Sequence, residues 1–147
     1  MRALLQKVSS ASVRVGESVV GEIRQGYLLF LCVMQGDSEE HVRKLAEKIC
    51  KLRLWEGEGG KINDRSILDV RGEILVVSQF TLAGRTEKGN RPDYTQAAPV
   101  SVACPLYAQF PALLQALGIH KVAVGQFGAA MQVTLTNEGP VTLMLET

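Results

Sequence analysis

The sequence lacks the residues and spacings that mark disulfide-rich, zinc-binding and redox proteins. Its 147 residues include three cysteines, an odd number, and no two of them have C-x-x-C spacing. The two histidines, His41 and His120, have no ligand spacing with them, so no metal site and no cofactor are expected. Cys32 and Cys50 lie in apolar segments and are expected to be small buried side chains in a reducing compartment.

The sequence also lacks an excess of charge and a long hydrophobic run. It has 16 Lys and Arg residues against 15 Asp and Glu residues, so its net charge of +1 argues against a general nucleic-acid binder. Any contact with RNA would have to use a local basic patch. No apolar stretch approaches the ~20 residues that span a bilayer, and the start does not resemble a signal peptide. We therefore expect a cytoplasmic protein with a single domain over residues 1–147.

Apolar periodicity predicts a chain of strands interrupted by two helices. One helix is expected to begin after Asp37 or Ser38 and to present an apolar stripe up to Cys50. The other is expected over residues 102–117, with a bend or break before Pro111, because an interior proline removes a backbone hydrogen bond. Strands are expected over residues 3–8, 12–15, 19–23, 27–33, 52–55, 73–80, 122–124, 131–135 and 141–145.

This order of elements predicts a mixed α/β domain: a largely antiparallel or barrel-like sheet covered by two helices. Several strands precede the first helix, which argues against a doubly wound nucleotide-binding fold. The run over residues 27–33 is apolar throughout and is typical of a strand that is covered on both faces.

Two short strings contain the candidate functional residues. The strongest predicted strand ends in Ser78, Gln79, Phe80 and Thr81. Polar groups at a strand end are well placed for a site, and a backbone N–H of Phe80 or Thr81 could stabilise an oxyanion. The alternative is an ordinary strand end whose hydroxyls bond nearby backbone, and spacing alone favours it. No Ser-His-Asp arrangement and no G-x-S-x-G motif accompanies the string.

The second string covers residues 137–142 and contains Gly139 and Pro140. By composition it is a turn between the last two predicted strands, because Asn, Gly and Pro are turn residues. The string 78–82 (SQFTL), the string 137–142 (NEGPVT) and the start of the chain, residues 2–13 (RALLQKVSSASV), together resemble segments of the D-aminoacyl-tRNA deacylase family. The resemblance extends over nearly the whole chain.

The resemblance implies a homodimer that hydrolyses D-aminoacyl-tRNA, and glycine mischarged on tRNA(Ala), with its active site at the subunit interface. It implies that residues 78–81 receive the aminoacylated end of tRNA and that the Phe80 amide orients the ester carbonyl. Thr81 is then a nucleophile, or the neighbouring ribose hydroxyl of the RNA assists water instead. It also implies a cis peptide bond between Gly139 and Pro140, which would enter the partner's pocket and exclude L side chains by collision.

Two further segments resemble the same family. Residues 125–131 contain Phe127 and Met131, whose family equivalents approach the ligand, although both could equally be core residues of a glycine bend. The loop over residues 85–92 contains three cations that could contact phosphate or be merely solvated. The chain departs from the family pattern with Gln126 for Arg, Gly84-Arg85 for Ala-Asp and Asp93-Tyr94 for Ser-Phe, which affects the details of tRNA docking.

Two other functions remain compatible with these patterns. One is a non-catalytic module that binds an RNA end or a nucleotide, a reading that the intact strings disfavour. The other is a hydrolase of small D-amino-acid esters that needs no RNA.

Overall fold

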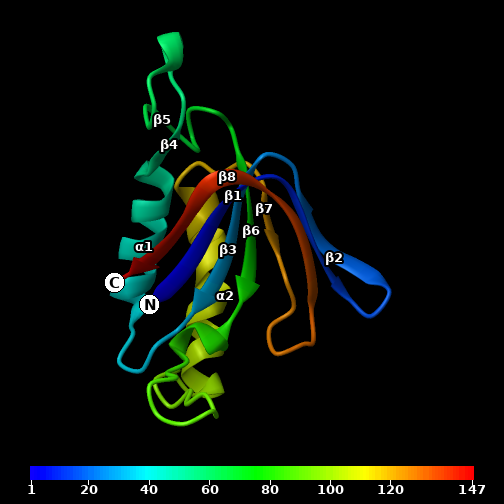
Figure 1. Cartoon of the computed structure of the whole chain (residues 1–147), viewed down its shortest axis with the longest axis vertical. Coiled ribbons are helices and arrows are strands. Elements are labelled where there is room, and N and C mark those ends of the chain that lie inside the picture. Colours follow the sequence, from blue (N-terminus) through cyan, green and yellow to red (C-terminus); the bar gives the residue numbers. More distant parts are fainter.

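The computed structural model describes all 147 residues, and Figure 1 shows the arrangement of its elements. In chain order these are β1 (Arg2–Val15), β2 (Ser18–Ile23), β3 (Gly26–Cys32), α1 (Glu39–Lys51), β4 (Arg53–Trp55), η1 (Glu58–Gly60), β5 (Arg65–Ser66), β6 (Glu73–Ser78), η2 (Phe80–Ala83), α2 (Val100–Ala116), β7 (Val122–Val124) and β8 (Gln132–Glu146). No helix is long and apolar enough to cross a membrane.

The main sheet has six strands of mixed direction, as the element order predicts. The long strand β1 pairs antiparallel with β3 through its first half, with β2 through its second half and with β8 along its other edge. Strands β3, β6 and β7 are parallel neighbours. The sheet curls until β2 nears β7: a Cβ atom on Gly21 would lie only 2.7 Å from the Val124 carbonyl oxygen. The result is a nearly closed, barrel-like sheet.

Two hydrophobic clusters lie on opposite faces of the sheet, because successive side chains of a strand alternate in direction. Leu29 and Val76 pack with both helices in the larger cluster, whereas Leu28, Leu75 and Val77 belong to the smaller one inside the curl. The central strands β3 and β6 are therefore buried on both faces, which confirms the prediction for the apolar run at residues 27–33.

Helix α1 confirms its predicted start, and its cap includes a histidine. Ser38 occupies the N-cap position, and His41 Nδ1 accepts a hydrogen bond from the Ser38 backbone N–H at 3.1 Å. His41 thus satisfies a backbone donor at the helix terminus. The apolar stripe of α1 is buried as expected, from Val42 to Cys50.

Helix α2 has no break at Pro111, one of the two predicted outcomes, because it is continuous from Val100 to Ala116. An interior proline costs ~3 kcal/mol in an isolated helix. Phe110 and Leu114, on either side of it, are fully buried in the larger cluster. Burying side chains of this size contributes about 1.5–3 kcal/mol each, enough to offset the proline.

The last two predicted strands are one strand, so the string at residues 137–142 is not a hairpin turn. β8 continues along β1 from end to end, but between the pairs Val8–Asn137 and Gln6–Thr142 the single β1 residue Lys7 faces four β8 residues. Residues 138–141 therefore bulge out of the ladder. Proline has no N–H for a ladder bond, which makes a bulge on an outer strand an acceptable place for it.

Candidate functional site

A cavity of about 630 Å³ is lined by segments that follow the three parallel strands β3, β6 and β7. The carboxyl ends of these strands lie at the lower end of the sheet in Figure 1. Because β3, β6 and β7 are parallel, their carboxyl ends meet at one edge, and the segments that follow them line the cavity. These segments contribute Cys32 and Val33, Ser78 to Phe80, and Phe127 to Ala129. The beginning of α2 and the segment before it complete the lining.

Of the residues predicted for the site, Ser78, Gln79, Phe80, Phe127 and Met131 line this cavity. Thr81 is their neighbour in η2, and its hydroxyl accepts a hydrogen bond from Gln79 Nε2 at 2.5 Å. Gly139 and Pro140 are not among the lining residues. A single chain thus brings residues 78–81 together with Phe127 and Met131 at the cavity. It leaves Gly139 and Pro140 outside the cavity.

The turn η2 presents backbone N–H groups next to the cavity. Its first internal hydrogen bond runs from the Leu82 N–H to the Gln79 carbonyl oxygen, at 3.2 Å. The N–H groups of Phe80 and Thr81 precede that bond, so the turn itself gives them no partner. The Gln79 N–H, by contrast, is bonded to the Leu31 carbonyl oxygen of β3 at 2.8 Å. The Phe80 and Thr81 amides are therefore the donors that this strand end can offer to a ligand.

The carbonyl groups of the same turn are held from several sides. The Thr81 oxygen accepts the Gly84 N–H at 2.9 Å, and the Leu82 oxygen accepts Arg2 Nη1 at 3.0 Å. Cys32 Sγ lies 3.5 Å from the Phe80 carbonyl oxygen. Burial raises the pKa of this thiol, which keeps its proton available for the contact. The turn is therefore tied to β1 and β3.

Two pairs of aromatic rings contribute to the cavity lining. Phe80 and Tyr94 meet edge to face, with ring centroids 5.3 Å apart. Tyr107 and Phe127 contact each other at 5.4 Å, and the Tyr107 hydroxyl donates a hydrogen bond to the Val76 carbonyl oxygen at 3.0 Å. Burial raises the pKa of Tyr107 to about 12, so it stays a neutral donor. Sequence reasoning missed both tyrosines, although Tyr94 is a rare aromatic in a polar stretch.

Met131 lies where Gly125 leaves room for it. A Cβ atom on Gly125 would be 2.7 Å from the Met131 sulfur. The glycine at residue 125 therefore lets the β7–β8 connection fold closely over a cavity-lining side chain.

The sequence departures at residues 84–85 and 93–94 face each other across the loop next to the cavity. Arg85 and Asp93 exchange two backbone hydrogen bonds of 2.9 Å, and their side chains form an ion pair of 2.7 Å. A Cβ atom on Gly84 would lie 2.9 Å from the Tyr94 ring. The residues at the two departures therefore contact each other, and Arg85 is already paired with Asp93. Lys88 and Arg91 form no ion pair with the protein.

The bulge that contains Gly139 and Pro140 is anchored at its base. Asn137 Nδ2 donates hydrogen bonds to the Lys7 carbonyl oxygen at 2.8 Å and to the Val141 carbonyl oxygen at 3.2 Å. The Lys7 ammonium lies 3.5 Å from the Glu138 carboxylate. The peptide bond between Gly139 and Pro140 is cis, and no atom lies within 4 Å of a Cβ position on Gly139. Gly139 and Pro140 are therefore exposed on the surface of the chain.

Comparison with known proteins gives a full-length match to one family. The model of the D-Tyr-tRNA(Tyr) deacylase family matches residues 4–146. The chain is 51% identical to a D-aminoacyl-tRNA deacylase of Roseiflexus sp. (strain RS-1). The alignment spans 146 residues and covers 99% of this chain and 93% of that protein. It is also 51% identical over 146 residues to a D-aminoacyl-tRNA deacylase of Cereibacter sphaeroides (strain ATCC 17029 / ATH 2.4.9), which covers 99% of each.

Solved structures share the fold. The chain is similar to the c-Myc DNA Unwinding Element Binding Protein, with a TM-score of 0.93 and 38% identity over 100% of this chain and 99% of that one. A probable eukaryotic D-amino acid tRNA deacylase has a TM-score of 0.83 at 18% identity, over 98% of this chain and 97% of its own. The second likeness concerns the fold alone.

The Arg85–Asp93 contact predicts an unusual carboxyl titration. Hydrogen bonds from Thr95 and then the Arg85 guanidinium lower the pKa of Asp93 from its ordinary 3.8 to about 2. The contact therefore stabilises the loop at pH values above 3.8, and this stabilisation is lost as the pH falls toward 2. In the variant Arg85→Gln the titration midpoint, followed by carboxyl NMR, should rise but remain below 3.8, because Thr95 still donates. Lys88→Gln removes an unpaired cation of the same loop and should not move it. An unchanged midpoint in Arg85→Gln would contradict this account.

Proposed function

Because the chain belongs to the D-Tyr-tRNA(Tyr) deacylase family, we propose that it hydrolyses the ester bond of D-aminoacyl-tRNA. Water adds to the ester carbonyl carbon, the bond to the ribose oxygen breaks, and free tRNA and D-amino acid leave. The observation that carries this proposal is the cavity at the ends of β3, β6 and β7, where the turn η2 offers two backbone donors beside an apolar chamber.

The Phe80 and Thr81 N–H groups are suited to the charge that develops during the reaction. When water adds to an ester, the carbonyl oxygen becomes an oxyanion, and backbone donors that are already oriented stabilise it. Removing one such donor typically costs about 3–4 kcal/mol in other enzymes. Fifteen of the 19 lining residues are hydrophobic, so hydrogen bonds to the oxyanion would act in poorly solvated surroundings, where they are stronger.

The protein supplies no evident base for the reaction. None of the residues that line the cavity is Asp, Glu, His, Lys or Arg. The Thr81 hydroxyl is engaged with the Gln79 amide, which can donate to it but cannot take up its proton. A threonine without a base is a poor nucleophile. We therefore assign the assistance to the ribose hydroxyl beside the ester, with the protein positioning the ester and stabilising charge.

The second string would act from another copy of the chain. Gly139 and Pro140 are absent from the lining of their own cavity, and nothing contacts the Cβ position of Gly139. In a two-fold dimer each copy can insert the same feature into the other. The outer face of β8 is available for such a contact, and Met144 on it is 52% exposed. We propose a homodimer in which each bulge reaches the partner's strand-end cavity.

A backbone bulge at that place explains strict handedness with broad tolerance of side chains. Backbone next to the α-carbon of the bound amino acid collides with an L side chain of any size and leaves the D side chain unaffected. Glycine has no side chain and would be accepted, so glycine mischarged on tRNA(Ala) is a substrate by the same argument. Lys88 and Arg91 are the unpaired cations of the loop next to the cavity and are available for phosphate oxygens of the tRNA.

The direct test compares D-tyrosyl-tRNA with L-tyrosyl-tRNA as substrates of the pure protein. We expect the D form to be hydrolysed at least roughly 100-fold faster, a difference of about 2.7 kcal/mol in activation free energy. Binding of tRNA without any turnover would instead favour the non-catalytic module. Equal turnover of D-tyrosine methyl ester and D-tyrosyl-tRNA would favour a hydrolase of small esters.

The proposed role of the bulge is tested by Pro140→Ala. Removing the ring enlarges the space beside the α-carbon, so hydrolysis of L-tyrosyl-tRNA should rise by roughly tenfold or more, about 1.4 kcal/mol. Hydrolysis of the D form should change little. Sedimentation must show that the variant keeps the oligomeric state of the parent, and unchanged handedness in such a variant would count against the mechanism.

The choice between nucleophile and RNA assistance is tested by Thr81→Ala, with Thr81→Ser as the matched control that keeps the hydroxyl. If RNA assists, both variants should retain activity within about tenfold of the parent. Loss of a covalent nucleophile would lower kcat by about 10⁶ in the Ala variant alone. Single-turnover hydrolysis of D-tyrosyl-tRNA by folded variants decides between the two.

A further inference from the structure

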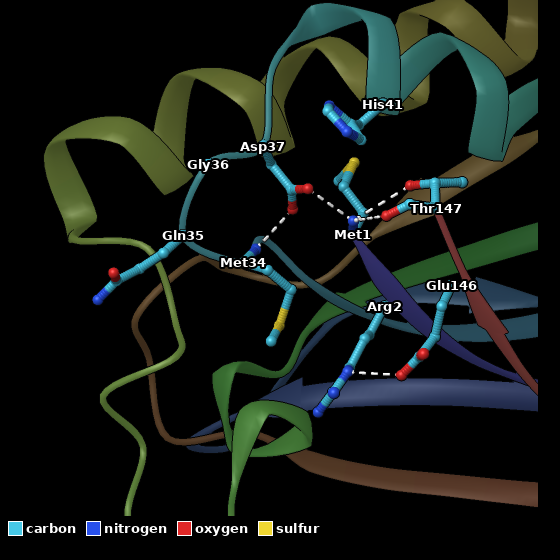
Figure 2. A pocket seen from close by; sticks show the side chains of 9 residues that line it. All are labelled: Met1, Arg2, Met34, Gln35, Gly36, Asp37, His41, Glu146 and Thr147. Atoms are coloured by element: carbon cyan, nitrogen blue, oxygen red, sulfur yellow. Dashed lines mark hydrogen bonds and ion pairs between the residues drawn. The ribbon is translucent and has the colours of Figure 1, made fainter.

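Arg2 connects the ends of the chain to the turn η2. It is the first residue of β1, and its Nε atom lies 2.6 Å from the Glu146 carboxylate at the end of β8. Its Nη1 atom donates a hydrogen bond of 3.0 Å to the Leu82 carbonyl oxygen. Figure 2 shows the pair with Glu146, and the green ribbon of the turn passes close to the guanidinium. The planar fork of arginine donors suits such a double contact.

The base of Arg2 is held firmly. Met1 is buried, and its ammonium lies 2.7 Å from the Asp37 carboxylate and donates to Thr147 (Figure 2). The Thr147 N–H in turn bonds the Met1 carbonyl oxygen at 3.1 Å. The first and last strands are therefore locked together next to Arg2, and its side chain extends from a rigid point.

The turn at the other end of Arg2 has few bonds of its own. It has only four residues, and 3₁₀ hydrogen bonds have poorer geometry than those of an α-helix. The contact between Cys32 and the Phe80 carbonyl oxygen is weak, because a thiol is a weak donor. The bond from Arg2 is the charge-assisted one, and bonds of this kind are about twice as strong as neutral ones.

Leu82 directly follows the two residues whose N–H groups are available to a ligand. Its own N–H bonds the Gln79 carbonyl oxygen, which closes the turn around Phe80 and Thr81. The carbonyl oxygen that Arg2 holds and the N–H that closes the turn belong to the same residue, Leu82. A shift of Leu82 would therefore tilt the Phe80 and Thr81 amides. Displacements of about 1 Å at a reacting centre cost on the order of 10²-fold in rate. As an ion pair Arg2 is partly exposed and contributes little to stability. Its effect should thus be on the reaction more than on folding.

We propose that Arg2 is a positioning residue for the hydrolysis: by holding the Leu82 carbonyl oxygen, it orients the Phe80 and Thr81 N–H groups toward the ester. This inference rests on the proposed function. Arg2 does not line the strand-end cavity and does not touch the substrate. It acts through the turn.

The test compares three variants in the full chain. Arg2→Met keeps the length of the side chain and removes its donors. Arg2→Lys keeps the charge and one donating group. Glu146→Gln removes the charge of the partner and leaves the bond to Leu82. With D-tyrosyl-tRNA, kcat should fall by roughly 10- to 100-fold in Arg2→Met, with KM within about twofold. Arg2→Lys should restore most of the loss, and Glu146→Gln should stay within about threefold of the parent.

Amide hydrogen exchange of Phe80 and Thr81 supplies a readout that does not depend on activity. Both amides should exchange faster in Arg2→Met than in the parent, at equal melting temperature. If the parent lacks deacylase activity, the proposed function fails, and exchange alone decides whether Arg2 orders the turn. Unchanged exchange would overturn the inference whatever the activity. A kcat loss that Arg2→Lys does not rescue, or one matched by global unfolding, would overturn it too.

Discussion

The parallel alignment of β3, β6 and β7 is the constraint on which the rest of the structure depends. It makes three strands end at the same edge, and the chain must then turn three times within a small volume. Helices α1 and α2 provide the long crossovers that parallel strands require and cover one face of the sheet. The cavity follows from this arrangement, because side chains from three turns and from the start of α2 meet around it without filling it.

The cavity combines apolar walls with an ordered backbone turn. The carbonyl groups of η2 have partners in β1, in β3 and within the turn itself, whereas the Phe80 and Thr81 amides have none from the turn. In the proposed hydrolysis, this turn stabilises charge through backbone geometry and does not depend on ionisable side chains. The absence of a catalytic triad from the sequence is consistent with our proposal that the substrate RNA supplies a hydroxyl.

The β8 bulge belongs to the fold, and it is also the feature to which we assign the proposed specificity. Pairing with β1 on both sides of residues 138–141 fixes the strand, and Asn137 donates hydrogen bonds to backbone of both β1 and β8 at the base of the bulge. Gly139 is exposed, and nothing beyond its chain neighbours contacts its Cβ position. A single chain has no use for such a feature, which is why we assign its role to contact between two copies.

The sequence by itself determined the fold class, the cap of α1 and the doubly covered strand β3, because apolar periodicity and capping residues are local signals. It also singled out several residues that the structure places around the cavity. It did not reveal that α2 continues through Pro111, since burial of Phe110 and Leu114 offsets a local penalty. It suggested a turn at residues 137–142, where pairing with β1 makes a bulge. It also missed Tyr94, Tyr107 and the Arg2 bond to Leu82, because contacts between residues 80 positions apart leave no pattern in a single sequence. Only the tertiary structure decides which strand ends meet, because strand direction and order depend on packing across the whole chain.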